Sequence, residues 1–209
     1  MRAYDEIYLA QARVSVARML DYAVNDAGYS LSEFWEMFVK SDVCHRYEHG
    51  ESRVLAGMSG VEMAREVIGT DMAPTFTLSR SREYWTGWAI AFFQWATSLS
   101  FAEITDVVAI EEIRDLYSPY HEMDILQFCD KMTELYAERV KDSNLKRIRK
   151  RAGLSQSELS QLSRVPLRTI QQYEQRQKNI NKASVEYVIT LSRVLCCEPS
   201  ELLEKIGNK

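Results

Sequence analysis

The stretch "RVPLRTIQQYEQRQKNINK", residues 164–182, combines two kinds of side chain that rarely serve one purpose. Ile170 and Tyr173 are typical of a protein core, whereas arginine and glutamine fill many of the positions around them. A helix turns about 100° per residue, so Arg168 and Gln172 fall within about 20° of the face opposite Ile170. The pattern therefore predicts a short helix that buries one face and presents planar hydrogen-bonding groups on the other.

The outward groups of this helix suit the edges of DNA bases. In the major groove, arginine pairs with the O6 and N7 atoms of guanine, and glutamine pairs with the N6 and N7 atoms of adenine. Arg168 and Gln172 are four residues apart and so lie side by side on the predicted helix. The alternative is an ordinary solvated face, but the arrangement favours contact with double-stranded DNA.

Five short helices are predicted around this stretch. Gly153 ends the first, Ser155 caps the second, and Pro166 opens the third, where its missing N–H costs nothing. The residues expected to face inward are Leu145, Ile148, Leu159, Leu162, Val165, Ile170, Tyr173, Val188, Leu191, Val194, Leu195, Leu202 and Leu203.

Residues 143–206 resemble the helix-turn-helix domain of the Cro/CI (XRE) family. The resemblance rests on "GLSQSELS", the Val-Pro-x-Arg-Thr-Ile junction, Glu174 after the recognition helix, and the ending "LSRVLCCEPSELL". It implies a five-helix, lambda-repressor-like fold. Ser160 departs from the pattern by replacing a packed alanine. Arg164 stands where glycine usually takes a left-handed turn, a strain on the order of 1 kcal/mol.

Carried over by position, the resemblance implies three groups of functional residues. Leu167, Arg168, Thr169 and Gln172 would face the bases; Gln156, Arg176, Lys178 and Asn179 would meet the DNA backbone; Arg149 and Glu174 would form a structural ion pair. For the loop residues, plain solvated surface is the alternative interpretation.

The sign of the charge changes near residue 141, close to where the resemblance to the Cro/CI family begins. Residues 1–141 hold 13 basic and 23 acidic side chains, whereas residues 142–209 hold 13 basic and 7 acidic ones. A polyanionic partner is therefore expected for the second part only. We expect an acidic helical domain over residues 1–141 and a Cro/CI-type DNA-binding domain over residues 142–209.

The region before residue 142 reads as helical throughout, so the fold class is predicted to be all-α. Helix starts of the Ser-x-x-Glu type occur at Ser30, Ser59 and Ser100. Apolar spacings of three and four residues predict helices over residues 9–23, 84–99 and 121–140. In the middle one, the apolar stripe is Tyr84, Trp88, Phe92, Trp95 and Leu99. Its apolar run is interrupted by polar residues, which favours a buried core helix over a membrane span.

The sequence offers little that resembles a chemical site. Cys44, His45 and His49, with His121 and Cys129, could suggest a metal, but the paired spacing of a zinc site is missing. The tryptophan-rich row of residues 85–95 could line a ligand pocket, although such rows are more often core. We expect no catalytic residues, no metal and no cofactor.

These observations predict a cytoplasmic DNA-binding transcription regulator, a repressor that acts as a homodimer, with no membrane partner. The acidic domain would dimerise the protein, sense a small-molecule effector or bind a second protein. The main alternative is an antitoxin, whose N-terminal domain would bind a toxin while the DNA-binding domain represses their shared promoter. An enzyme is the least favoured class, because no nucleophile–base pair is evident.

Overall fold

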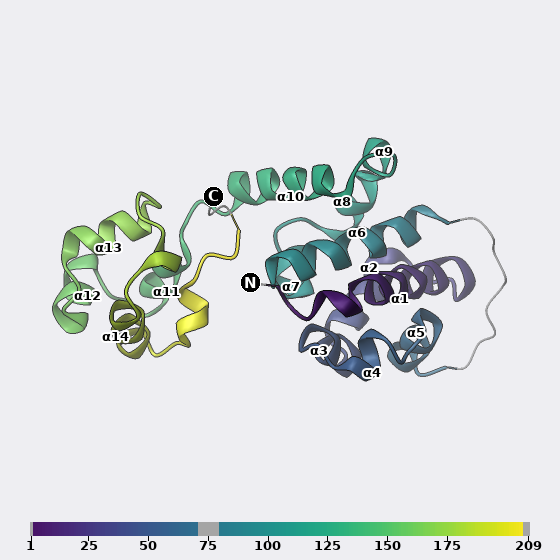
Figure 1. Cartoon of the computed structure of the whole chain (residues 1–209), viewed down its shortest axis with the longest axis horizontal. Helices are drawn as coiled ribbons and strands as arrows, with labels where there is room; N and C mark the ends of the chain where they lie inside the picture. The colour runs from purple at the N-terminus through teal and green to yellow at the C-terminus, as the bar shows by residue number, and fades with distance from the viewer. Residues whose placement is uncertain (1, 71–79, 207–209) are drawn as a thin grey trace. The chain divides into compact units, whose positions relative to one another are not determined.

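The protein is helical, as expected for an all-α fold. A computed structural model describes residues 2–70 and 80–206, and contains no strand within those ranges (Figure 1). The chain separates into two compact units, residues 1–135 and residues 136–209. Among the described helices, none has the length and apolar character needed to cross a membrane.

Helices of up to 16 residues build the first unit, and the last of them, α10, extends past its boundary at residue 135. They are η1 (Glu6–Tyr8), α1 (Leu9–Asp21), η2 (Tyr22–Asp26), α2 (Leu31–Val39), α3 (Asp42–Glu48), α4 (Ser52–Leu55), α5 (Gly60–Ile68), α6 (Arg82–Thr97), α7 (Phe101–Thr105), α8 (Ile110–Asp115), α9 (Tyr117–Tyr120) and α10 (Ile125–Arg139). The predicted helix starts are confirmed, because Ser30, Ser59 and Ser100 each accept a hydrogen bond from the backbone N–H three residues later.

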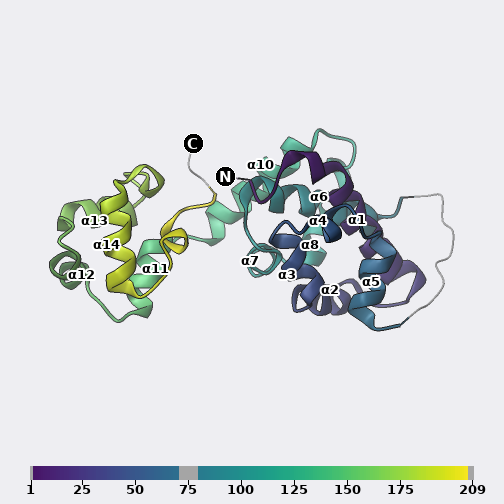
Figure 2. The same ribbon diagram turned by 60° about the horizontal axis from the view of Figure 1, so that its bottom comes forward.

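Helix α1 lies at the centre of this unit, packed against α5 and α6 (Figures 1 and 2). Two glycines allow the close approach. A β-carbon on Gly60 would lie 2.3 Å from the Ser15 carbonyl oxygen, and one on Gly87 would lie 2.6 Å from the Val16 carbonyl oxygen. Both distances are too short for any side chain. The two neighbouring helices therefore contact the α1 backbone itself.

Helix α6 is central as predicted, but its most buried face differs from the predicted stripe. Trp85, Ala89, Ile90 and Phe93 are buried, whereas Tyr84, Trp88 and Phe92 of the stripe are only partly buried. Gly87 explains the difference, because it turns its own side of the helix toward α1 and leaves part of the aromatic stripe at the margin. A hydrophobic pattern reports which residues can be buried, but not how closely the backbones approach.

An arginine covers part of that aromatic margin. The Arg13 guanidinium lies 3.3 Å from the centroid of the Trp88 ring and 4.7 Å from that of Phe92, and its Nε donates to the Trp88 carbonyl oxygen. Its Nη2 atom is buried and has no hydrogen-bond partner among the described residues. Burial lowers the pKa of Arg13 to about 10, so this side chain keeps its positive charge at neutral pH.

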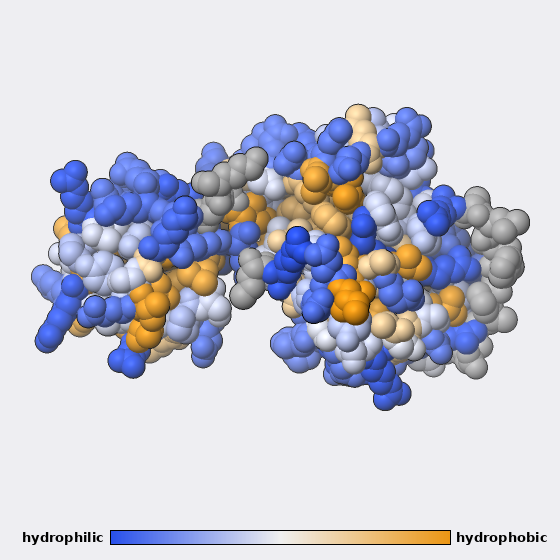
Figure 3. Space-filling view, viewed as in Figure 1, coloured by the Kyte–Doolittle hydropathy of each residue, from blue (hydrophilic) through white to orange (hydrophobic). Residues whose placement is uncertain are grey.

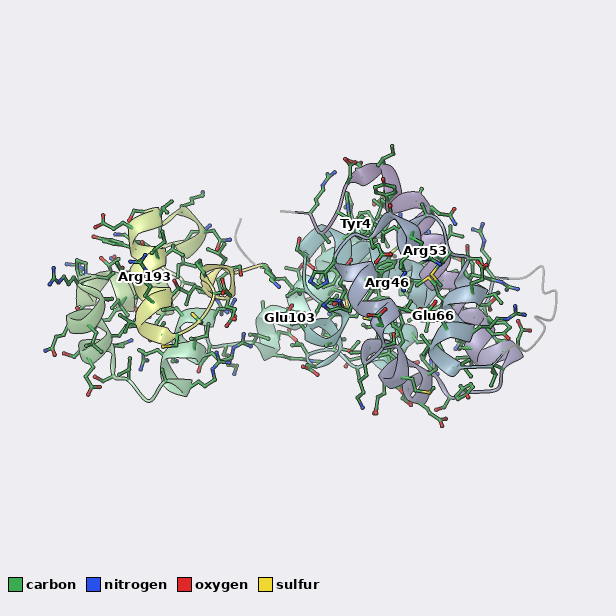
Figure 4. All side chains as sticks on the ribbon, turned by 90° about the horizontal axis from the view of Figure 1, so that it is seen from below. Tyr4, Arg46, Arg53, Glu66, Glu103 and Arg193 are labelled. Atoms are coloured by element: carbon green, nitrogen blue, oxygen red, sulfur yellow. The ribbon has the colours of Figure 1, made fainter. Side chains whose placement is uncertain are left out.

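Two polar clusters hold the first unit together away from its core. The buried Asp21 carboxylate accepts hydrogen bonds from Arg18, from Asn25 (3.1 Å) and from Ser81 (2.6 Å), which ties α1 to the start of α6. On another face, Arg46 pairs with acidic residues of three segments, and Glu66 of α5 lies beside it at 3.3 Å (Figure 4). Arg18 and Arg46 are thus both neutralised.

The second unit contains the five predicted short helices, the last of which is a 3₁₀ turn. They are α11 (Asn144–Arg151), α12 (Gln156–Ser163), α13 (Leu167–Glu174), α14 (Val185–Leu195) and η4 (Pro199–Leu202), with an additional turn η3 (Ile180–Lys182). Their buried apolar side chains form one core: Leu145, Ile148, Leu159, Val165, Ile170, Tyr173, Ile180, Leu191, Leu195 and Leu202.

Two details of that unit differ from the sequence-based expectation. Leu162 was expected inside but is 61% exposed, because the last inward position of α12 is taken by Ser163, four residues after Leu159. Pro166 was expected within the third helix, but it precedes α13 as the N-cap with an extended ψ of 134°.

Candidate nucleic-acid interface

A buried ion pair joins the first helix of the second unit to the end of α13. The Arg149 guanidinium donates from Nε and Nη2 to the two carboxylate oxygens of Glu174, at 2.6 and 2.9 Å. The two side chains are only 10% and 1% exposed. Arg149 also donates to the Leu154 carbonyl oxygen at 2.6 Å, and its pKa is raised chiefly by the hydrogen bonds to Glu174. This pair fixes the carboxyl end of α13 against α11.

Gln156, predicted to meet the DNA backbone, is oriented by the same carboxylate. Its Nε2 donates to Glu174 at 2.7 Å, so Glu174 receives three hydrogen bonds. An amide nitrogen carries two hydrogens, and the second remains for another acceptor. Gln156 is the first residue of α12 and is partly exposed. Its position therefore suits a contact with a DNA phosphate, since helix N-termini favour anions.

The turn between α12 and α13 is held by serine hydroxyls. Ser160 donates from its Oγ to the Val165 carbonyl oxygen at 2.7 Å, and Ser163 accepts from the Val165 N–H at 3.3 Å. Arg164 between them has a φ of 58°, the left-handed conformation expected at this position. The hydroxyl of Ser160, which looked like a mild departure in sequence, is thus a structural contact. Sequence reasoning missed it because only the folded turn brings the two residues together.

Helix α13 buries one face and exposes the other, as the periodicity predicted. Ile170, Tyr173 and Glu174 are buried, while Arg168 is exposed and Gln172 is partly exposed. Neither outward side chain has a hydrogen-bond or ion-pair partner among the described residues. The donors and acceptors of this face are therefore available to a ligand. The other two residues predicted to face the bases are Leu167, which is 38% exposed, and Thr169, which is partly exposed.

Helix α13 ends in a left-handed residue that fastens several segments. Arg176 has a φ of 56°, and the Gln177 N–H beyond it returns to the Gln172 carbonyl oxygen at 2.9 Å. The Arg176 guanidinium donates to the carbonyl oxygens of residues 140–142 at 3.1 to 3.3 Å, and to the Glu204 carboxylate at 3.3 Å. These contacts favour a positioning role for Arg176 over the predicted contact with the DNA backbone.

The two remaining loop residues differ in what they contact. Lys178 is exposed and has no ion pair within the described ranges. The Asn179 side chain accepts a hydrogen bond from the Asn181 N–H at 2.8 Å and so caps η3. Lys178 is therefore available to contact a DNA phosphate, whereas the Asn179 side chain also stabilises the start of η3.

Other basic residues of this unit are partly neutralised. Lys146 and Lys150 of α11 both pair with Asp142, at 2.6 and 2.8 Å, and they lower the pKa of that carboxyl to about 2. Arg151 lies 3.7 Å from Glu201. Hydrophilic side chains dominate the surface of the unit in the view of Figure 3, where α13 forms its upper part. Arg168 on α13 and Lys178 after it are not among the paired cations of the described residues, so this face suits a polyanion.

Comparison with protein families supports this geometry. Residues 145–202 match the family model described as Helix-turn-helix. These residues form a helix-turn-helix domain. The match agrees with the Cro/CI resemblance, and it makes α12 and α13 the two helices of the motif, joined by the turn at Arg164. No curated protein and no solved structure shows significant similarity to the chain. The helix-turn-helix domain indicates a DNA-binding transcription regulator, and the first unit has no assigned family.

Proposed function

We propose that the protein is a sequence-specific repressor that binds operator DNA as a homodimer. The pair Arg168, which is exposed, and Gln172, which is partly exposed, carries this proposal, because both side chains lie opposite the buried face of α13 and lack partners among the described residues. An α-helix of this kind fits the major groove of B-DNA, where these two side chain types discriminate base pairs. Gln156 and Lys178 would hold the phosphates on either side.

Dimerisation is proposed because a single helix-turn-helix motif contacts too few base pairs to select one operator. One recognition helix covers only a few base pairs, and a genome offers about 10⁶ or more competing sites. Two motifs related by a two-fold axis read half-sites about 34 Å apart, so that their binding energies combine. The first unit is the part available for this task, since an excess of acidic residues makes it an unsuitable contact for DNA.

Substitutions on α13 test the recognition face. Arg168→Ala and Gln172→Ala should each weaken operator binding by about 1–3 kcal/mol and relax the preference at one base pair. Operator sequences would first be selected from random DNA with the full-length protein, and affinities would then be measured by fluorescence anisotropy on the operator and on scrambled DNA.

Lys178→Ala is the matched control. It should weaken binding to operator and scrambled DNA about equally and reduce the salt dependence, because a phosphate contact carries no sequence information. Intact operator affinity in Arg168→Ala would refute the assignment of α13 to base recognition.

An antitoxin is the second candidate function, favoured by the charge of the first unit. Residues 1–135 hold 22 acidic and 11 basic side chains, and such a surface suits a basic protein partner. In that case the helix-turn-helix domain would still bind DNA, and the first unit would bind a toxin. Comparing the DNA affinities of the full-length and shortened proteins separates the two functions, as described in the Discussion.

A further inference from the structure

We infer that the first unit holds a binding site for a small planar aromatic acid, in a cavity at the N-terminus of α6. The cavity has a volume of about 230 Å³. Its lining residues are Arg80, Ser81, Tyr84, Trp85, Trp88, Tyr117 and His121. This inference does not rest on DNA binding, because all of these residues belong to the first unit.

Aromatic rings supported from behind form the walls of the cavity. Trp85 meets Tyr117 edge to face with ring centroids 5.7 Å apart, and Tyr117 stacks on His121 at 3.9 Å. On its other side, Trp85 packs against the buried ring of Phe128, at 5.4 Å. Trp88 is covered by Arg13 at 3.3 Å. Because these rings are held by their neighbours, their flat faces and edges form a preformed surface for another planar ring.

Positive charge gathers at this aromatic surface. The Arg80 guanidinium lies 5.2 Å from the centroid of Tyr84, and that of Arg82 lies 5.7 Å from the centroid of Tyr117. Within the described ranges neither arginine pairs with a carboxylate. This differs from Arg18 and Arg46 of the same unit, which are both neutralised. The cations therefore stand over the cavity rings with their hydrogen-bond donors available.

Acidic groups also lie near the cavity, and one of them, Glu83 in the first turn of α6, is partly exposed and follows Arg82 directly in the sequence. Asp21 reaches the cavity through Ser81, but its carboxylate already accepts from Arg18, Asn25 and Ser81. Glu122 lies 3.5 Å from His121 and is exposed. Helix α6 adds the positive end of its dipole, since the cavity lies at the N-terminus of a 16-residue helix. An anionic group would thus be attracted to the side of the cavity near Arg80 and Arg82.

The size and chemistry of the cavity limit the ligand to one class. Its volume lies below the roughly 300–1,000 Å³ of sites for drug-sized ligands, so one ring or two fused rings would fill it. A carboxylate matches the planar donor fork of arginine. An aromatic carboxylate satisfies both the rings and the cations, whereas a neutral ring would leave the two arginines without a counter-charge.

The four tryptophans provide a direct test by NMR. Full-length protein with ¹⁵N-labelled indole nitrogens would be titrated with 2-naphthoate, without DNA. We expect the signals of Trp85 and Trp88 to shift, because both side chains line the cavity. The signals of Trp35 and Trp95 should not shift, because neither side chain lines the cavity; their indole N–H groups are bonded elsewhere, to Thr105 and to the Tyr4 carbonyl oxygen. Tryptophan-to-phenylalanine variants assign the four signals.

Matched probes and variants separate charge from shape. The neutral isostere 2-naphthamide should bind about tenfold more weakly than 2-naphthoate, since it lacks the charge-assisted hydrogen bonds. The double variant Arg80→Gln, Arg82→Gln should remove this difference, whereas Arg53→Gln on α4, an exposed arginine (Figure 4), should retain it. The proposal fails if Trp85 and Trp88 do not respond, if all four indoles shift alike, or if the double variant still prefers the acid.

Discussion

Glu174 places a carboxylate in the interior of the helix-turn-helix domain, with a side chain only 1% exposed. Its charge is compensated by Arg149, and removal of one partner leaves the other charge buried and unpaired. Glu174→Leu and Arg149→Met should therefore each destabilise the domain by up to about 3–5 kcal/mol. Urea unfolding of each variant, followed by circular dichroism, measures the loss of free energy of unfolding.

The double variant Arg149→Met, Glu174→Leu is the informative companion. Replacing both charges by apolar groups of similar size should recover most of the lost stability, because no buried charge remains. Gln156 would then lose the acceptor that orients it, so DNA affinity should stay reduced even in a stable double variant. Single variants as stable as the parent would contradict the role given to the pair.

At Gly87 of α6, close packing against α1 requires a residue without a side chain, although glycine is unfavourable within a helix. In a helix, Gly→Ala ordinarily stabilises by about 0.5–1 kcal/mol. Here the new β-carbon would meet the Val16 carbonyl oxygen of α1 at 2.6 Å, and forced overpacking costs about 1–3 kcal/mol. Gly87→Ala should therefore destabilise the first unit. Thermal unfolding shows whether Gly87→Ala raises or lowers the stability of the first unit. The reverse change, Ala96→Gly at an exposed position of α6, measures the helix preference alone. A stabilised Gly87→Ala variant would show that α1 and α6 can separate without cost.

These helices show what sequence could and could not predict. The caps at Ser30, Ser59 and Ser100 and the two-sided character of α13 followed from local spacing, since both depend on residues within one or two turns. The Glu174–Arg149 pair came from family resemblance, because 25 residues separate the partners. The approach of Gly87 to α1 and the hydroxyl contact of Ser160 depend on the folded chain, so no periodicity could indicate them.

The two units together lead to a prediction about assembly. If the first unit, residues 1–135, holds the homodimer, the full-length protein should sediment as a dimer and bind a pseudo-palindromic operator. A chain shortened to residues 136–209 should be a folded monomer that binds about 10²-fold or more weakly, because the second contact loses its effective concentration. This boundary keeps the carbonyl groups that Arg176 requires at residues 140–142.

Analytical ultracentrifugation and operator titration of both chains test this prediction. The isolated first unit should also dimerise, which serves as the positive control. Equal operator affinity of the long and short chains would show that the first unit serves another purpose, and would favour the antitoxin.

The contacts of Arg176 bear on whether the helix-turn-helix domain could be inserted into another protein or circularly permuted. One guanidinium binds both the entering chain at residues 140–142 and the leaving chain at Glu204. Asn144 strengthens this closure through the Leu203 carbonyl oxygen at 2.7 Å. The entry and exit of the domain are therefore adjacent, which is the condition for inserting a domain into a surface loop of an unrelated host. The same closure would allow circular permutation, with the old ends joined by a short linker and new ends opened in a loop remote from α13.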